Sequence, residues 1–290
     1  MNSDSSSINK TKINWFPGHM KKALNKISDN LKIFDFVIEL LDSRIPLSSK
    51  NDYVEKIITN KPKLILLTKT DLSDEKETQK WVKYLTQNGN IALAINLKTN
   101  GDITKIIDTI NILCKDKKDK ALKKGIKNVT LRGLIIGIPN VGKSTLINYL
   151  AKKSITKVAN TPGLTRNIRF VRIKDIELAD TPGVLEPQYE DQKKAINLAL
   201  VGSIKNEILP KEELVNYCLD FLKQYYLNAL KSRYKLEEIT DNYQILEKIS
   251  KNRGFFNKNN ELNIEKAIDV ILNEFKNGVI TKFSLERVDA

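Results

Sequence analysis

From residue 137 to residue 144 the sequence reads Gly-Ile-Pro-Asn-Val-Gly-Lys-Ser, which fits the pattern G-x-x-x-x-G-K-[ST]. The apolar run before it, Leu131 to Ile136, is typical of a buried strand, and a helix is expected from Lys143. In that setting backbone N–H groups surround phosphate oxygens at the positive end of the helix. We expect Lys143 to contact the β- and γ-phosphates of a nucleotide and the hydroxyl of Ser144 to bind Mg²⁺. The predicted phosphate-binding residues are Asn140, Val141, Gly142, Lys143, Ser144 and Thr145.

Asn140, in the middle of this loop, has two interpretations. An asparagine at this place can help to hold a monovalent cation such as K⁺, which adds positive charge beside the phosphates as an arginine finger does in other GTPases. Alternatively, its side chain only shapes the loop, because asparagine favours turn conformations. The residues alone leave both interpretations open.

A second polar motif, Asp-Thr-Pro-Gly, occupies residues 180–183 at the end of another strand-like run. We expect Asp180 to hold the Mg²⁺ shell and the N–H of Gly183 to bond to the γ-phosphate. Thr165 lies in the polar loop between the two motifs, where a threonine that closes over Mg²⁺ in the GTP-bound state would lie. The predicted metal ligands are therefore Ser144, Thr165 and Asp180.

The run Thr-Lys-Thr-Asp at residues 68–71 ends an apolar segment and resembles the N/T-K-x-D box that selects guanine. The carboxylate of Asp71 would accept bonds from N1–H and the exocyclic amine of guanine, a donor pair that adenine lacks. We expect the stem of Lys69 to pack along the base. Thr68 stands where asparagine is usual, and we expect this change to weaken both the side-chain bond to the base and the brace to the phosphate loop. The predicted final nucleotide loop follows the next apolar run and consists of Asn96, Leu97 and Lys98.

The order of these motifs is reversed, because conventional GTPases place the phosphate loop before the guanine box. Alternating strand-like and helical runs predict an α/β fold with a mainly parallel sheet covered on both faces. After about Pro187 amphipathic helical patterns replace the strands. We therefore predict a flexible leader at residues 1–12, a circularly permuted P-loop GTPase domain at residues 13–188 and a smaller, mostly helical domain at residues 189–290. The helical domain would then be attached directly to the switch that contains Gly183.

The charge balance favours an anionic partner. Lys and Arg total 49 against 35 Asp and Glu, so the net charge is +14. Nucleic acid is the first candidate partner and an anionic membrane surface the second, whereas a general bias toward Lys, Asn and Ile is the alternative explanation. The Lys-dense segment from Lys115 to Lys127 is interpreted as a solvated connector or an exposed helix end, with direct RNA contact as the other interpretation.

Other features indicate a cytoplasmic protein. Cys114 and Cys218 lie far apart in the sequence without metal-ligand spacing, which is typical of buried, reduced thiols. No apolar run approaches membrane-spanning length, and the Ser-, Asn- and Lys-rich start does not resemble a signal peptide. We expect no membrane partner.

The residue after the Asp-Thr-Pro-Gly motif is Val184, where many GTPases have a glutamine that orients the attacking water. A valine cannot bond to water, so another group must act or intrinsic hydrolysis must be slow. The single histidine, His19, lies in the run Trp-Phe-Pro-Gly-His-Met at residues 15–20. From the residues alone, a catalytic and a structural role of His19 are both open.

This run, the Asp-Ser-Arg-Ile-Pro segment at residues 42–46 and the two phosphate motifs together resemble the ribosome biogenesis GTPase A family, also called YlqF. The resemblance covers nearly the whole chain except the leader. It implies a cytoplasmic GTPase that hydrolyses Mg²⁺·GTP, binds the rRNA and proteins of the immature large ribosomal subunit late in assembly, and leaves after hydrolysis. It also implies that His19 is the catalytic residue and that residues 189–290 form an RNA- and ribosome-binding bundle. We expect the protein to be a monomer off the ribosome.

The residues also permit two other functions. In one, the chain is an RNA-binding placeholder whose nucleotide only sets its conformation, in agreement with Val184 and the +14 charge. In the other, which Asp71 argues against, it is an ATPase with the same kind of sheet.

Overall fold

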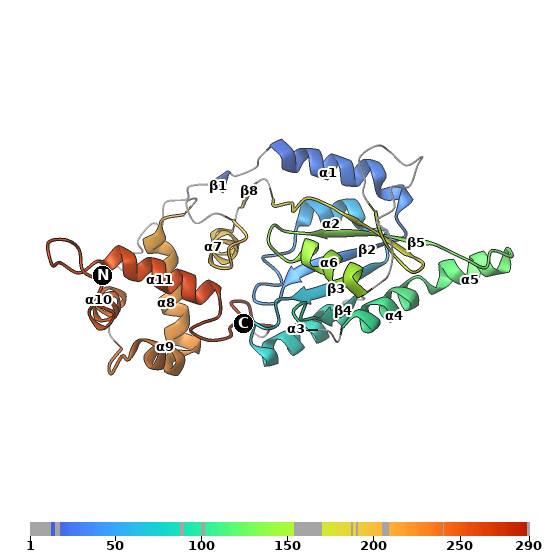
Figure 1. Cartoon of the computed structure of the whole chain (residues 1–290). Helices are drawn as coiled ribbons and strands as arrows, with labels where there is room; N and C mark the ends of the chain where they lie inside the picture. Colours follow the sequence, from blue (N-terminus) through green and yellow to red (C-terminus); the bar gives the residue numbers. More distant parts are fainter. Residues whose placement is uncertain are drawn as a thin grey trace, which may run out of the picture.

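The computed structural model describes residues 13–14, 18–87, 90–99, 102–153, 170–186, 188–189, 191–204, 209–239 and 241–288. Strands and helices alternate in its first part, and helices pack together in its last part (Figure 1). The predicted leader, residues 1–12, lies outside the described residues. In the described part, none of the helices has the length and apolar character needed to cross a membrane.

The first part is built on a six-stranded sheet with the order β4-β3-β2-β5-β7-β6. Every residue of β2 is buried, and since successive side chains of a strand point to opposite faces, both faces of the sheet are covered. This confirms the predicted α/β fold with a mainly parallel sheet. The parallel strands are β2 (Phe36–Asp42), β3 (Lys63–Thr68), β4 (Ile91–Ala94), β5 (Leu131–Gly137) and β7 (Ile176–Asp180), and β6 (Phe170–Ile173) runs antiparallel to β7.

The helices of this part follow the predicted alternation. The segment from Lys115 to Lys127 forms a helix over most of its length, and this helix, α5, buries none of its residues. Figure 1 shows α5 projecting beyond the sheet at the end of α4. The elements are α1 (Gly18–Asn30), the short 3₁₀ helix η1 (Leu31–Ile33), α2 (Asp52–Ile58), α3 (Glu75–Gln87), α4 (Ile103–Leu113), α5 (Lys115–Lys123) and α6 (Lys143–Lys153).

The last part of the chain is helical and forms a lobe beside the sheet (Figure 1). One of its helices, α11, buries an apolar face made of Ile268, Ile271, Leu272 and Phe275. This helix ends at Lys276, and Gly278 follows with a φ of 68°, a conformation that favours glycine at a helix end. The elements are α7 (Gln192–Leu200), α8 (Lys211–Tyr225), α9 (Leu227–Tyr234), α10 (Asn242–Asn252) and α11 (Ile264–Lys276).

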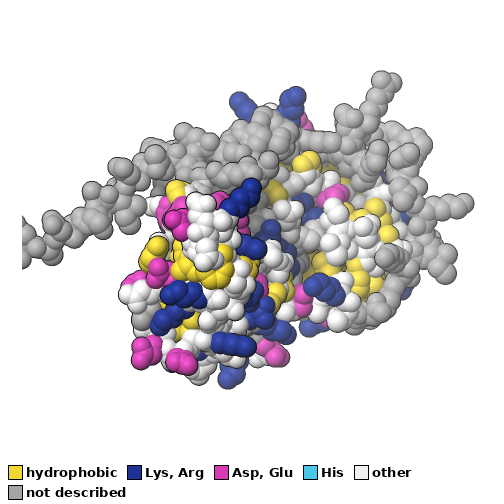
Figure 2. All heavy atoms as spheres, turned by 60° about the vertical axis from the view of Figure 1, so that its left-hand side comes forward, with side chains coloured by type: hydrophobic (Ala, Val, Ile, Leu, Met, Phe, Trp, Pro, Cys, Tyr) yellow, Lys and Arg dark blue, Asp and Glu magenta, His cyan; other side chains and the backbone are white. Residues whose placement is uncertain are grey.

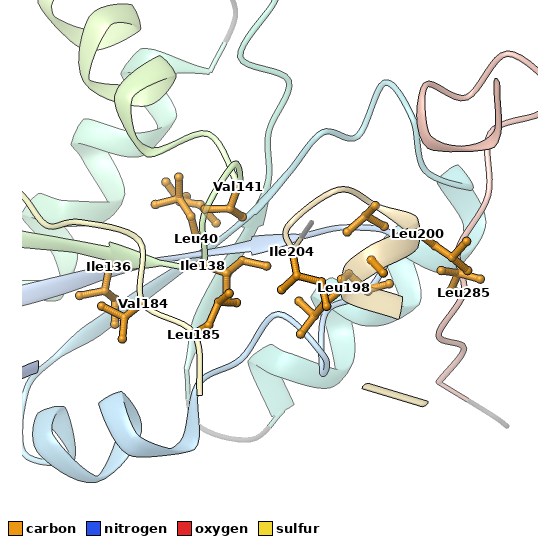
Figure 3. Packing of buried hydrophobic residues seen from close by; sticks show 14 of the residues in the cluster. Leu40, Ile136, Ile138, Val141, Val184, Leu185, Leu198, Leu200, Ile204 and Leu285 are labelled. Carbon is orange, nitrogen blue, oxygen red and sulfur yellow. The ribbon is translucent and has the colours of Figure 1, made fainter. Parts of the chain in front are cut away.

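The sheet and the helices share one hydrophobic core. Ile136 and Ile138, at the end of β5, belong to the same buried cluster as Leu198 of α7 and Leu285 near the chain end (Figure 3). The starting segment is also attached, because β1 (Ile13–Asn14) pairs antiparallel with β8 (Gln188–Tyr189) just before α7. Burial of this continuous apolar surface stabilises the helical lobe against the sheet.

A buried ion pair forms a second connection between the two parts. Asp42, the last residue of β2, is fully buried, and its carboxylate accepts bonds from Arg44 Nε at 2.9 Å and Nη2 at 2.7 Å. Arg44 Nη1 donates to the carbonyl oxygen of Lys276, the last residue of α11, at 2.7 Å. Burial alone would raise the pKa of Asp42, but Arg44 and Lys69 hold it well below its ordinary value.

We predict that Arg44→Met lowers the free energy of unfolding by about 3–5 kcal/mol, because it removes one partner of a buried ion pair. Urea denaturation near neutral pH measures this loss. Arg172→Met, a change at an exposed arginine, is the matched control and should shift stability by less than about 0.5 kcal/mol. Equal stability of the two variants would contradict the structural role of Arg44.

Candidate functional site

The phosphate loop lies between the end of β5 and the start of α6. Asn140 and Gly142 have positive φ angles of 59° and 111°, so the backbone turns sharply before the helix begins. Asparagine and glycine are the residues that tolerate this conformation best. The loop therefore has the curved backbone that the sequence pattern requires.

Lys143 bends back over this loop. Its Nζ donates to the carbonyl oxygens of Gly137 at 3.1 Å and Ile138 at 2.8 Å, and the residue is buried. Burial lowers the pKa of Lys143 to about 8, although the neighbouring Asp180 opposes this shift. The ammonium group is thus placed inside the loop that is predicted to hold phosphate.

The Asp-Thr-Pro-Gly motif packs directly against the phosphate loop. A Cβ atom on Gly183 would lie 2.7 Å from Cα and N of Pro139 and 3.0 Å from Lys143 Nζ, so no side chain fits there. The N–H of Val184 donates to the carbonyl of Gly137 at 3.3 Å. The motif and the phosphate loop are therefore in direct contact, and a movement of the motif would displace the loop.

Ser144 and Asp180 offer the oxygen ligands that Mg²⁺ prefers. Asp180 lies at the end of β7 opposite Ile135 of β5, two residues before Gly137 at the start of the loop. Burial raises the pKa of Asp180, and Lys143 opposes the rise. Within the described ranges there is no cluster of three or more His, Cys, Asp or Glu side chains suited to a metal. A hydroxyl and a carboxylate fit an ion that takes its other ligands from phosphates and water.

The predicted guanine box lies at the end of β3, beside the phosphate loop. The hydroxyl of Thr68 lies 2.7 Å from the carbonyl oxygen of Val141 and 3.2 Å from that of Leu41, so it bridges to the loop. The brace to the phosphate loop is therefore present with threonine, while its weakening relative to asparagine stays a prediction. Lys69 Nζ lies 3.0 Å from the Asp42 carboxylate, and Asp71 pairs with Lys98 at 2.6 Å.

These elements line one cavity of about 310 Å³. Thr68, Lys69 and Asp71 line it together with Asn96, Leu97 and Lys98, and the phosphate loop contributes Asn140, Val141, Gly142 and Thr145. Lys143, Ser144, Asp180 and Gly183 do not line the cavity and lie around its phosphate-loop side. The sequence did not predict five further residues that line the cavity: Arg44, Leu72, Val201, Lys276 and Asn277. Of these, only Arg44 belongs to a motif identified in the sequence.

Asn140 has a structural partner. Its side-chain Nδ2 donates to the carbonyl oxygen of Gly202, just after α7, at 2.9 Å. This bond favours the loop-shaping interpretation of Asn140, whereas the potassium site stays a prediction.

Three other positions singled out in the sequence are Thr165, His19 and Val184. Thr165 lies outside the described residues, and His19 lies in the first turn of α1 with a side chain that is not described. Val184 is buried in the apolar contact between the sheet and α7, beside Leu185 (Figure 3). It therefore acts as a core residue.

Comparisons with known proteins agree with this arrangement. A model of the family described as 50S ribosome-binding GTPase matches residues 132–258, and this match begins just before the phosphate loop. Ribosome biogenesis GTPase A of Bacillus cereus is 41% identical over 276 residues, which is 94% of this chain and 93% of that protein. The probable ribosome biogenesis GTPase A of Mycoplasma genitalium is 35% identical over 276 residues, covering 95% of this chain and 97% of that protein.

Two solved structures are also similar to this chain. A GDP-bound YlqF is similar with a TM-score of 0.66 and 25% identity, over 91% of this chain and 100% of that one. A GNP-bound YlqF from T. maritima is similar with a TM-score of 0.62 and 25% identity, over 92% of this chain and 98% of that one.

The lowered pKa of Lys143 predicts that nucleotide binding takes up a proton above pH 8. Bound phosphate stabilises the ammonium form and raises the pKa, so between about pH 8 and pH 10.5 the free protein is less protonated than the complex. Affinity should consequently fall as the pH rises above about 8. Calorimetric titration with GDP at pH about 9, in buffers of different ionisation enthalpy, measures the uptake. Little uptake is expected at pH about 7, and buffer-independent heats at pH about 9 would contradict the prediction.

Proposed function

Because the chain belongs to the ribosome biogenesis GTPase A family, and is thus a GTP hydrolase involved in ribosome biogenesis, we propose that it acts in late maturation of the large ribosomal subunit. It binds the immature particle as Mg²⁺·GTP, the particle accelerates hydrolysis, and the GDP form leaves. Off the particle it is a cytoplasmic monomer.

One observation supports the proposed nucleotide site above the others. Asp71 and the phosphate loop border the same cavity although their order in the sequence is reversed. In the proposed orientation guanine lies at the Asp71 end of the cavity and the phosphates lie at the Gly142 end. Only this orientation places the base beside a carboxylate acceptor and the phosphates beside backbone N–H donors. The same orientation places the γ-phosphate toward Lys143 and Gly183.

Hydrolysis proceeds by in-line attack of water on the γ-phosphorus. Lys143 stabilises the charge that develops, and Ser144, Thr165 and Asp180 would hold an Mg²⁺ ion that would supply further positive charge there. Since Val184 is buried and has no polar side chain, the water is positioned by another group. We assign this role to His19, which would position the water when the particle is bound.

The helical part, residues 189–290, is proposed to contact the particle. Five residues, 184–188, separate it from the switch motif, and two of them, Val184 and Leu185, are buried, so loss of the γ-phosphate has a short route to α7 (Figure 3). On the lobe formed by α8–α11, basic side chains are interspersed with acidic ones (Figure 2). Its contacts with the particle then depend on shape and on individual residues more than on a uniform basic patch.

A second function is favoured by the burial of Val184: a placeholder that binds RNA and uses nucleotide only to set its conformation. Single-turnover hydrolysis distinguishes the two functions. The GTPase is accelerated by a precursor of the large subunit and much less by the mature large or small subunit. A placeholder hydrolyses GTP at the same low rate with all three.

We predict that Asp71→Asn weakens GTP binding on the order of 100-fold, because it removes charged hydrogen bonds to guanine. The same variant should gain affinity for xanthosine triphosphate, since the asparagine amide donates to the C2 carbonyl of xanthine. Competition binding with the two nucleotides measures both changes. Asp108→Asn, at an exposed position outside the cavity, should behave like the wild type. An unchanged preference for guanine in Asp71→Asn would contradict the proposed site.

We predict that His19→Ala lowers the particle-stimulated rate by about 10-fold or more, which is the scale of a lost proton-transfer or water-positioning group. GTP affinity should change little, because the phosphate loop and guanine box are intact. Rates are measured with a large-subunit precursor, and Lys21→Ala, on the same helix, is the control. A stimulated rate equal to that of the wild type would show that His19 has no catalytic role.

A further inference from the structure

The positive charge of this chain is distributed unevenly. Residues 189–290 contain 16 Lys and Arg and 16 Asp and Glu, so they carry no net charge. The whole excess of +14 therefore lies in residues 1–188. The segment 115–127 alone contains seven Lys and two Asp. The electrostatic attraction for a polyanion is consequently centred outside the helical lobe.

We call residues 115–127, which consist of α5 and the four residues after it, the basic arm. None of the residues in α5 is buried, so the helix contributes little to the core. Two of its lysines hold it to the body of the domain. Lys117 pairs with Asp35 at 2.5 Å, and Lys118 pairs with Asp175 at 2.6 Å.

The remaining lysines of the arm are exposed, and over the described parts of the chain none of them has a carboxylate within ion-pair distance. Because the two anchoring pairs fix the arm, these ammonium groups are presented to solvent from a supported helix. The free lysines are Lys115, Lys120, Lys123, Lys124 and Lys127.

A second element adds to this surface. A hollow of about 400 Å³ lies between the arm and the β6–β7 hairpin, and its wall includes Arg172 of β6 and Lys174 of the following turn. Leu122 and Ile126, which are 64% and 51% exposed, lie on the arm side of the same hollow. Cations from two separate elements thus surround an open groove with apolar contact area.

The groove lies away from the nucleotide site. Asp35 and Asp175, which anchor the arm, each come just before the first residue of a parallel strand, β2 and β7. Ligand sites of such sheets lie at the opposite, carboxyl ends of the strands, and no arm residue lines the nucleotide cavity. The two surfaces can therefore be occupied at once.

We propose that the basic arm, together with Arg172 and Lys174, binds the phosphate backbone of RNA. Each lysine that neutralises a phosphate releases counterions, and the apolar side chains cover sugar or base surface. The choice of RNA as the polyanion rests on the proposed function, in which the partner is an RNA-containing particle. This surface is additional to the helical contact in that proposal.

The test compares two triple variants with equal loss of charge. In the arm variant, Lys120, Lys123 and Lys124 are changed to Gln. In the control, the change to Gln is made at three exposed lysines of α2 and α3, outside the arm, the lobe and the nucleotide cavity: Lys56, Lys76 and Lys83. Binding of a fluorescein-labelled RNA stem-loop is followed by anisotropy over a range of KCl concentrations. Binding of phosphatidylglycerol vesicles is measured in parallel.

The arm variant should bind the RNA about 10- to 100-fold more weakly at low salt, and its slope of log affinity against log salt should fall by about 2, while the control stays near the wild type. A version with the three arm lysines changed to Arg should keep its affinity, and GDP binding and melting temperature should be unchanged in all variants. An arm variant that binds RNA as the control does would overturn the proposal, and so would one that loses only vesicle binding. If a large-subunit precursor fails to stimulate the wild type, the proposed function fails instead, independently of the arm result.

Discussion

The parallel pairing of β2 with β5 is the constraint on which the rest of the molecule depends. It joins residues 36–40 to residues 133–137, and so connects the half of the sheet that carries the guanine box to the half that carries the phosphate loop. Gly133 makes the pairing close, because a Cβ atom there would lie 2.4 Å from the ring of Phe36. Neither half can form a nucleotide site alone, so the permuted order is tolerated only while these two strands stay hydrogen-bonded.

Two polar contacts transfer this register to the loops above the sheet. The hydroxyl of Thr68 bridges from the end of β3 to Val141, and the carboxylate of Asp42 at the end of β2 holds both Arg44 and Lys69. Burying such charges costs several kcal/mol per ion before their attraction offsets it, so this network is a weak source of net stability. The network instead determines the positions of the side chains that it joins. Lys69 and, through Arg44, the end of α11 are positioned by the same buried carboxylate.

Much of this arrangement could be predicted from the sequence. Apolar runs that end in polar motifs predicted where strands lie along the chain, and the amphipathic patterns after about Pro187 predicted the helical part. These signals are local in the chain. The lining of the cavity by Val201, Lys276 and Asn277 could not be predicted, because it depends on how the lobe packs against the sheet. The geometry of the brace from Thr68 to Val141 likewise depends on how the end of β3 meets the phosphate loop, which the motif alone does not specify.

The connection between the lobe and the nucleotide site has a further consequence for how the molecule changes state. Gly183 packs so closely against Pro139 that no side chain fits between them, and the next two residues are buried against Ile136 and Ile138 (Figure 3). On the other side of the cavity, Asn140 holds Gly202 and Arg44 holds Lys276. The lobe is therefore attached at three points around one cavity, and a packed contact of this kind shifts between discrete arrangements more readily than it deforms gradually. Since the lobe carries no net charge, its movement would alter the fit to a partner while the charged part of the chain keeps its long-range attraction unchanged.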